Sequence, residues 1–199
     1  QSRQLLNLPQ DGFVMLFLGR KTPYKGLDVA LTAYTALRTL YPQLYFIIAG
    51  PDTYYSRKLL ARYSTLPGLI VLGTVPHEMK LHLLNACDCL VLPSTGEALG
   101  YVFLEAWIYG KPVVGVRTAS VSTVVDDGRD GFLIQPAGAA EMAERVARWI
   151  EDPDLARQMG LRGQEKVLRR YTISRIADVV EGVYLRILRE RRRALVGWA

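Results

Sequence analysis

The sequence has little of what disulfide and metal sites require. Of its 199 residues, 2 are cysteine and 2 are histidine. Cys87 and Cys89 are one residue apart, so they would face the same side of a strand and could not form a useful disulfide. No histidine or further cysteine completes a metal site with them, and the acidic pair Asp126-Asp127 lacks Asp-x-Asp spacing. We therefore expect two buried free thiols in a reducing compartment.

Long apolar runs and a targeting leader are also missing. No run is long enough to span a membrane. The chain begins at Gln1 without an initiator methionine or a basic-then-apolar leader, so we expect an excised part of a longer protein. Half of the residues are hydrophobic, and 17 glycines and 10 prolines complete an ordinary globular composition. A chain of 199 residues is long enough for one domain with a hydrophobic core, so we assign residues 1–199 to a single domain.

Acidic residues are outnumbered by basic ones. The chain has 25 Lys and Arg against 19 Asp and Glu, a formal net charge of +6. Such a balance favours an anionic ligand, nucleic acid or a membrane surface as partner. Nucleic acid is set aside, because basic residues do not interleave with aromatics on a strand face. The excess gathers near the C-terminus, where two interpretations stay open: complementing a helix dipole, or peripheral contact with an anionic membrane. This C-terminal cluster is Arg186, Arg189, Arg191, Arg192 and Arg193.

Short apolar runs alternate with amphipathic segments over the first two thirds of the chain. Glycine and proline bound the runs, as they bound buried parallel strands. The alternation predicts a doubly wound parallel α/β sheet. Residues 1–10 are expected to be a linker with a marginal helical turn. We expect strands at Phe13–Leu18, Leu44–Ala49, Leu69–Leu72, Cys89–Leu92, Val113–Val116 and 132–134, and helices at 27–41, 54–63, His77–Ala86, 101–109, 139–150, Pro153–Arg170 and 173–193.

Two glutamates bracket a predicted strand–loop–helix junction. Glu97 lies in the loop at the carboxyl end of a strand, where open α/β sheets bind ligands. Glu105 lies within the helix among apolar residues, where a carboxylate is costly unless it is paired. Between them, Gly100 allows close approach of a ligand to the amides of Tyr101 and Val102 at a helix N-terminus, a natural anion site. The arrangement suits a ligand with hydroxyls at both ends and phosphate between them, such as a nucleotide sugar.

A second loop, Gly19 to Gly26, joins the first strand to its helix and carries Arg20, Lys21 and Lys25. Cations beside a helix N-terminus favour phosphate over a merely solvated basic loop. The spacing is neither that of the Gly-x-Gly-x-x-Gly dinucleotide motif nor that of a P-loop.

Together these motifs resemble those of the retaining GT-B glycosyltransferases, especially the large family 4, or group 1. Glu97-x7-Glu105 is similar to the family's acidic signature, and Gly19-Arg20-x4-Lys25-Gly26 to its basic loop. The resemblance implies the Rossmann-like, C-terminal, donor-binding half of a GT-B enzyme. It implies that Arg20, Lys25 and Glu97 serve catalysis: the two cations clamp the diphosphate, and Glu97 orients the sugar. The implied donor-binding set is Gly19, Gly26, Val75, Ala98, Leu99, Gly100, Tyr101, Val102 and Glu105, with Glu105 on the ribose and Val75 in the nucleobase turn.

The chain departs from the family pattern at two places. Gly50-Pro51 stands where the family often has Gly-x-Gly, and residues 119–123 stand where it usually has Gly-Gly-x-x-Glu. The acid of the second motif is missing, so the role of this segment in closing the site or contacting an acceptor is an open question.

The resemblance implies a cytoplasmic, metal-independent and cofactor-free glycosyltransferase that takes its sugar from a nucleoside-diphosphate donor. Its partner is an N-terminal acceptor domain of the same full-length protein, without which this part should bind donor but transfer poorly. Family 4 enzymes often act at the inner membrane face, which would give the C-terminal arginines a purpose. The alternative is a non-catalytic nucleotide- or phosphate-binding module of the same fold. The sequence names neither the sugar, the base nor the acceptor.

Overall fold

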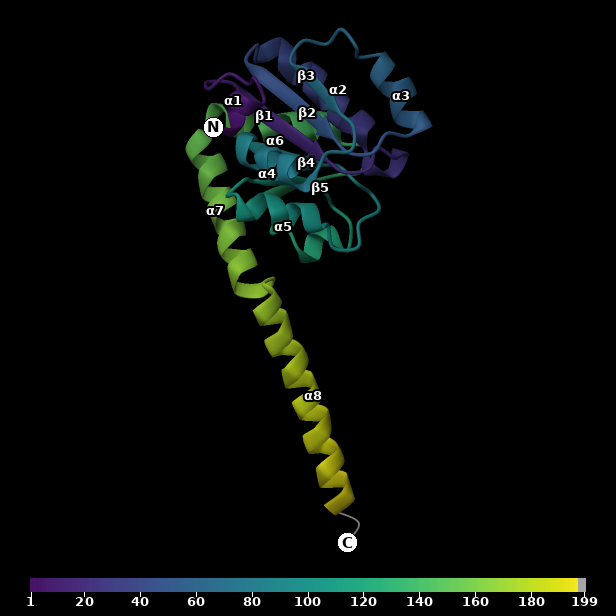
Figure 1. Cartoon of the computed structure of the whole chain (residues 1–199), viewed down its shortest axis with the longest axis vertical. Helices are drawn as coiled ribbons and strands as arrows, with labels where there is room; N and C mark the ends of the chain where they lie inside the picture. Colours follow the sequence, from purple (N-terminus) through teal and green to yellow (C-terminus); the bar gives the residue numbers. More distant parts are fainter. Residues whose placement is uncertain (197–199) are drawn as a thin grey trace. The chain divides into compact units, whose positions relative to one another are not determined.

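Six parallel strands form one sheet in the order β3-β2-β1-β4-β5-β6 (Figure 1). This computed structural model describes residues 1–196, with side chains up to residue 191. The order reverses between β1 and β4, which confirms the predicted doubly wound parallel sheet. Met15 of β1 aligns with Cys89 of β4 at this junction. The strands are β1 (Phe13–Leu18), β2 (Leu44–Ala49), β3 (Leu69–Leu72), β4 (Cys89–Leu92), β5 (Val113–Val116) and β6 (Gly131–Ile134).

Helices cover both faces of the sheet (Figure 1). Right-handed crossovers place α2 and α3 on one face and α4 and α5 on the other. α6 packs beside α2, and α1 packs beside α4. The predicted helices are all present, and their ends differ from the predicted ones by at most three residues. They are α2 (Leu27–Leu40), α3 (Tyr54–Ala61), α4 (His77–Ala86), α5 (Tyr101–Ile108), α6 (Ala139–Glu151), α7 (Pro153–Arg170) and α8 (Ile173–Val196). A further short helix, α1 (Ser2–Leu5), lies where only a marginal helical turn was expected.

The core lies between the sheet and its helices. Every residue of β4, β5 and β6 is buried, as near-continuous apolar strands of a parallel sheet should be. The edge strand β3 is only partly buried. Trp107 of α5 and Trp149 of α6 are fully buried, and the indole of Trp107 donates to the carbonyl of Asp130 at 2.9 Å. Cys87 and Cys89 are free and buried, as predicted.

The N-terminal segment is more than the expected linker. The guanidinium of Arg3 pairs with Asp88 at 2.6 Å and donates to four backbone carbonyls. The buried hydroxyl of Ser2 lies 3.1 Å from Nδ1 of His82 and accepts from Asn85 at 2.9 Å. The segment is therefore fixed by side-chain hydrogen bonds to α4 and to the start of β4, which local sequence patterns do not reveal.

The chain divides into two compact units, residues 1–164 and a second unit that begins at Glu165. All of the predicted site residues lie in the first unit. The second unit consists mainly of α8, and apolar side chains between residues 173 and 188, such as those of Ile173 and Tyr184, are exposed. Among the described residues, no helix combines the length and the apolar character needed to cross a lipid bilayer. The assignment of residues 1–199 to one domain stays a prediction.

Candidate functional site

The two sequence motifs follow β1 and β4, the neighbouring strands at which the strand order reverses. The basic loop follows β1, and the loop with Glu97 follows β4. In open α/β sheets, ligands bind beyond the carboxyl ends of the strands at such a reversal, because the loops on either side diverge and leave a crevice. The sheet topology therefore brings both motifs to one ligand-binding edge.

The two loops are in direct contact. The amide of Thr95 donates to the carbonyl of Tyr24 at 2.9 Å. Gly26 has φ of +70°, and a Cβ at this position would lie 2.1 Å from the carbonyl oxygen of Pro93. Only glycine combines this left-handed backbone with so close an approach. Gly26 is therefore required for the contact between the loops.

Lys25 and Glu97 form an ion pair across the loop contact. Their side chains are only 17% and 10% exposed, so the pair is largely withdrawn from water. The backbone carbonyl of Glu97 also accepts a 2.6 Å hydrogen bond from the hydroxyl of Ser120. Ser120 belongs to segment 119–123, which lacks the family's acid. In this structure that segment holds the Glu97 loop in place.

The three cations of the basic loop lie in different surroundings. Arg20 is exposed, and its side chain has no hydrogen bond or ion pair with any residue that the structure describes. Lys21 is fully buried, and its Nζ lies 2.6 Å from both Asp52 Oδ1 and the carbonyl oxygen of Leu72. Lys21 therefore joins the ends of β1, β2 and β3, and Arg20 and Lys25 remain as candidates for binding phosphate.

Gly100 is the N-cap residue of α5 and has φ of +72°. Helical amides in the first turn, such as those of Tyr101 and Val102, have no intrahelical acceptor. The side chain of Tyr101 is 72% exposed, so the helix N-terminus is open to solvent. Ala98 and Leu99 precede it in the same loop, and Gly19 directly follows β1 at the same edge of the sheet.

The surroundings of Glu105 differ from those expected from the sequence. Its side chain is 38% exposed rather than enclosed by apolar groups, and Oε1 lies 2.8 Å from Nζ of Lys80 in α4. Sequence reasoning missed Lys80, because α4 is distant from Glu105 along the chain. Val75 lies just before α4, in the turn after β3, and the neighbouring Gly73 accepts from the amide of Gly50 at 3.0 Å.

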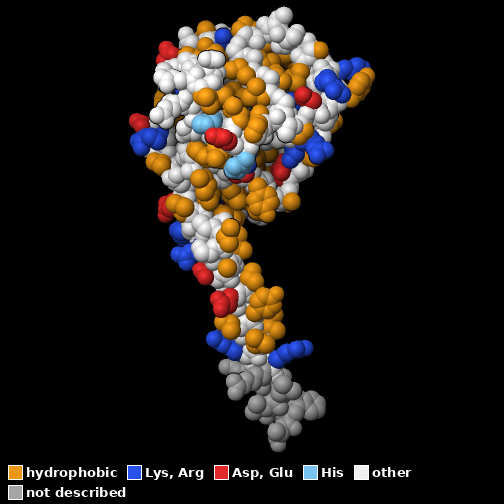
Figure 2. All heavy atoms as spheres, viewed as in Figure 1, with side chains coloured by type: hydrophobic (Ala, Val, Ile, Leu, Met, Phe, Trp, Pro, Cys, Tyr) orange, Lys and Arg blue, Asp and Glu red, His pale blue; other side chains and the backbone are white. Residues whose placement is uncertain are grey.

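The histidines and Asp127 lie outside the two motif loops, and His82 and Asp127 have structural hydrogen bonds. His77 is exposed and His82 is half-buried, and Figure 2 shows both histidine side chains at the surface. Burial alone would raise the pKa of the Asp127 carboxyl, but the amide of Leu133 and the guanidinium of Arg117 outweigh it and lower that pKa. Among residues 1–196, no group of three or more His, Cys, Asp and Glu residues could hold a metal ion.

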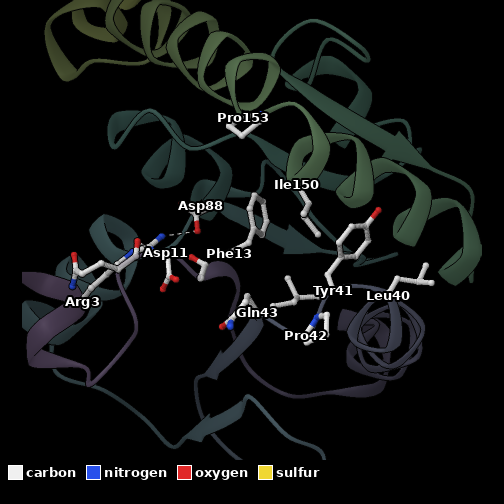
Figure 3. Close-up of a pocket in the computed structure, with 13 residues that line it drawn as sticks. Arg3, Asp11, Phe13, Leu40, Tyr41, Pro42, Gln43, Asp88, Ile150 and Pro153 are labelled. Atoms are coloured by element: carbon white, nitrogen blue, oxygen red, sulfur yellow. Dashed lines mark hydrogen bonds and ion pairs between the residues drawn. The ribbon is translucent and has the colours of Figure 1, made fainter.

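A cavity of about 520 Å³ lies at the opposite edge of the sheet, by the amino ends of β1 and β2 (Figure 3). Phe13, Tyr41 and Ile150 form apolar walls, and the Arg3–Asp88 ion pair lies at one side. None of the predicted donor-binding residues lines this cavity. Its size alone therefore does not make it the candidate site, which we place at the carboxyl edge of the sheet because the two motifs meet there.

Comparisons with known proteins identify the family and the fold of this chain. A curated relative, the D-inositol 3-phosphate glycosyltransferase of Acidothermus cellulolyticus, is 31% identical over 205 residues, covering 98% of this chain and 45% of the relative. The Anabaena protein HepE in complex with UDP and glucose has a TM-score of 0.79 at 26% identity, over 92% of this chain and 50% of that one. This chain spans about half the length of the curated relatives it matches.

The C-terminal domain of LpcC, a glycosyl transferase group 1 family protein from Francisella tularensis, has a TM-score of 0.76 over 87% of this chain and 92% of that domain. At 20% identity this likeness concerns the fold alone. The sequence profile described as Glycosyl transferases group 1 matches residues 1–166. The chain therefore belongs to the group 1 glycosyl transferases, and its six-stranded sheet is a Rossmann-like domain of the GT-B fold.

Proposed function

We propose that this chain binds the nucleoside-diphosphate sugar of a retaining glycosyltransferase at the carboxyl edge of its sheet. The observation that carries the proposal is the contact between the two motif loops, with Lys25 and Glu97 paired across it. In this contact a cation suited to phosphate lies beside an acid suited to sugar hydroxyls, which matches the adjoining diphosphate and sugar of one donor molecule. The structure of HepE with UDP and glucose, a 26% identical relative, supports the class of ligand.

The proposed mechanism assigns charge stabilisation to the basic loop. Negative charge develops on the leaving diphosphate as the glycosidic bond breaks, and cations already held in place stabilise it without reorganisation. Arg20 is exposed and available for this role. Lys25 would exchange part of its interaction with Glu97 for the diphosphate when the donor binds. The amides at the α5 N-terminus would add uncharged donors to the same phosphates.

Glu97 and Glu105 would hold opposite ends of the donor. Glu97 would orient the transferred sugar, and Glu105 would accept hydrogen bonds from the ribose. The sugar changes between ground and transition state, whereas the ribose does not. In the full-length enzyme, Glu97→Gln should therefore lower kcat, and Glu105→Gln should mainly raise KM. Indistinguishable kinetics for the two variants would contradict this assignment.

The mechanism is proposed to need neither metal nor cofactor, because the two cations take the place of a metal at the diphosphate. Calorimetry of the chain with UDP and with GDP, with and without a chelator, tests this. We expect weak binding that chelation does not alter. Strict dependence on magnesium would refute the metal-free mechanism, and absence of binding to either diphosphate would refute the donor site itself.

Transfer requires an acceptor site, which we place in an N-terminal domain of the full-length protein, consistent with the share of its relatives that this chain covers. A non-catalytic binding module is the alternative. Donor hydrolysis and transfer assays on the full-length protein separate the two, because the module would bind nucleotide without turnover.

Two buried free thiols support a cytoplasmic location. We also propose peripheral contact of α8 with an anionic membrane through the C-terminal arginines. Arg186, Arg189 and Arg191 fall among the described side chains, and those of residues 192 and 193 lie outside them. Co-sedimentation with anionic vesicles at low salt tests this. Unchanged binding after all five arginines become glutamine would exclude the cluster, and no binding would refute the contact.

A further inference from the structure

Lys80 and Glu105 form an ion pair between two helices on the same face of the sheet. Lys80 is in the first turn of α4, and Glu105 is the fifth residue of α5. Nζ of Lys80 donates to Oε1 of Glu105 at 2.8 Å, and the two side chains are 25% and 38% exposed. The pair is therefore accessible from solvent while both groups are partly enclosed.

The pair leaves hydrogen-bonding capacity on both partners. A carboxylate has about four lone-pair sites on its two oxygens, and an ammonium group has three N–H donors. Lys80 occupies one site on Oε1, so Oε2 remains available to accept from vicinal hydroxyls. The backbone amide of Lys80 also donates to the carbonyl of Pro76 at 3.0 Å. This is the ordinary first helical hydrogen bond of α4, so Lys80 lies one helical turn after the segment that contains Val75, the residue predicted to lie near the nucleobase.

Partly exposed ion pairs add little to folding stability, because solvent screens them and the side chains lose freedom. A structural purpose alone is therefore a weak explanation for this pair. Its geometric effect is larger, because it restricts the rotation of the half-buried Glu105 side chain. Restricting a binding group in advance lowers the entropic cost of engaging a ligand.

We propose that Lys80 is a positioning residue that holds the carboxylate of Glu105 toward the ribose hydroxyls of the donor. This inference rests on the proposed function, in which Glu105 binds the ribose. It makes Lys80 act on nucleotide binding through Glu105, at the nucleoside end of the donor and away from the bond that breaks.

Calorimetry with two ligands tests the proposal in the 199-residue chain. One ligand is UDP, and the other is 2′,3′-dideoxyuridine diphosphate, which keeps the base and the diphosphate but lacks the ribose hydroxyls. Lys80→Gln should weaken UDP binding about three- to tenfold, which matches the loss of one well-placed hydrogen bond. It should change dideoxy-ligand binding by less than about twofold, since that ligand does not use Glu105. Lys80→Arg should restore most of the UDP affinity, because it keeps the charge and the donor.

A double-mutant cycle identifies the route of action. If Lys80 acts through Glu105, adding Lys80→Gln to Glu105→Gln should cause no further loss of UDP affinity. Lys58→Gln is the matched control, because Lys58 is a surface lysine on α3 whose recorded contact is with the ring of Tyr54. It should leave both affinities unchanged.

Several outcomes overturn the proposal. Equal weakening of both ligands, additive losses in the double mutant or unaltered UDP affinity would each exclude a positioning role. Loss of cooperative unfolding in Lys80→Gln would assign the pair to stability instead. Failure of the unmodified chain to bind UDP or GDP would overturn the proposed function, and this inference with it. If the unmodified chain binds UDP but Lys80→Gln does not weaken UDP binding more than dideoxy-ligand binding, only the role of Lys80 is overturned and the proposed function stands.

Discussion

Replacing Lys21 by methionine should destabilise the protein without removing a phosphate ligand. The sequence places Lys21 beside Arg20 in the basic loop, yet its side chain is fully buried and lies 2.6 Å from both Asp52 and the carbonyl of Leu72. Methionine keeps most of the apolar stem and removes the charge and all three donors. The variant therefore isolates the two hydrogen bonds that join the loops after β1 and β2 to the end of β3.

The expected loss follows from these contacts. Hydrogen bonds to a charged group each contribute about 1.5–3 kcal/mol. Asp52 is 41% exposed and is hydrated again when the lysine is lost, so the contribution of its hydrogen bond lies at the lower end of this range. Removing the lysine also removes the free-energy cost of burying its charge, which offsets part of the stability lost with the two hydrogen bonds. We expect a net loss of about 2 kcal/mol, which at about 2 kcal/mol per molar lowers the urea midpoint by about 1 M.

Urea denaturation followed by tryptophan fluorescence measures this loss, with Lys58→Met as the surface control, for which we expect a change within about 0.5 kcal/mol. Nucleotide affinity of folded Lys21→Met should stay within about threefold of the parent, whereas Lys25→Met should lose affinity with a smaller loss of stability. An unchanged urea midpoint in Lys21→Met, or abolished nucleotide binding in a variant of normal stability, would refute the structural role.

Three further predictions follow from single sites. Gly26→Ala should destabilise the chain by at least about 1–3 kcal/mol in urea, because φ is +70° and the new Cβ would lie 2.1 Å from a backbone oxygen; a smaller loss would contradict the loop contact. Burial raises the pKa of the Cys87 thiol to about 12 and that of the Cys89 thiol also, so both should resist alkylation at pH 8 until urea unfolds the chain. Rapid labelling of the folded chain would exclude this. The folded pKa of Asp127 is lowered, so its carboxylate stabilises the fold above its unfolded pKa of about 3.9 and ceases to do so as pH falls through the folded value. The difference in unfolding free energy between the parent and Asp127→Asn should therefore be largest near neutral pH and shrink below about pH 4, and a difference that grows on acidification would reverse the assigned sign.

Most secondary structure was predictable because it is encoded locally. The strand Phe13–Leu18, for example, is a short apolar run between Gly12 and Gly19, and burial on both faces of a parallel sheet needs nothing more specific. The alternation of strands and helices then restricts the topology, since crossovers between parallel strands are right-handed. The positions of Glu97 and the basic loop at strand ends were also local features. Their placement at one edge of the sheet follows from the predicted topology.

Which side chains meet at that edge was decided by the tertiary structure. Lys21 and Lys25 are both lysines of one loop, and the sequence does not distinguish their roles. The surroundings do: Lys21 fits beneath the ends of β2 and β3, and Lys25 faces Glu97 across the loop contact. Likewise, Lys80 reaches Glu105 only because α4 and α5 lie on the same face of the sheet. The sequence by itself thus determined the elements, their order and the two motif loops, because those depend on neighbouring residues. The ion pairs within and around the loops depend on residues distant in the chain, and only the folded arrangement brings them together.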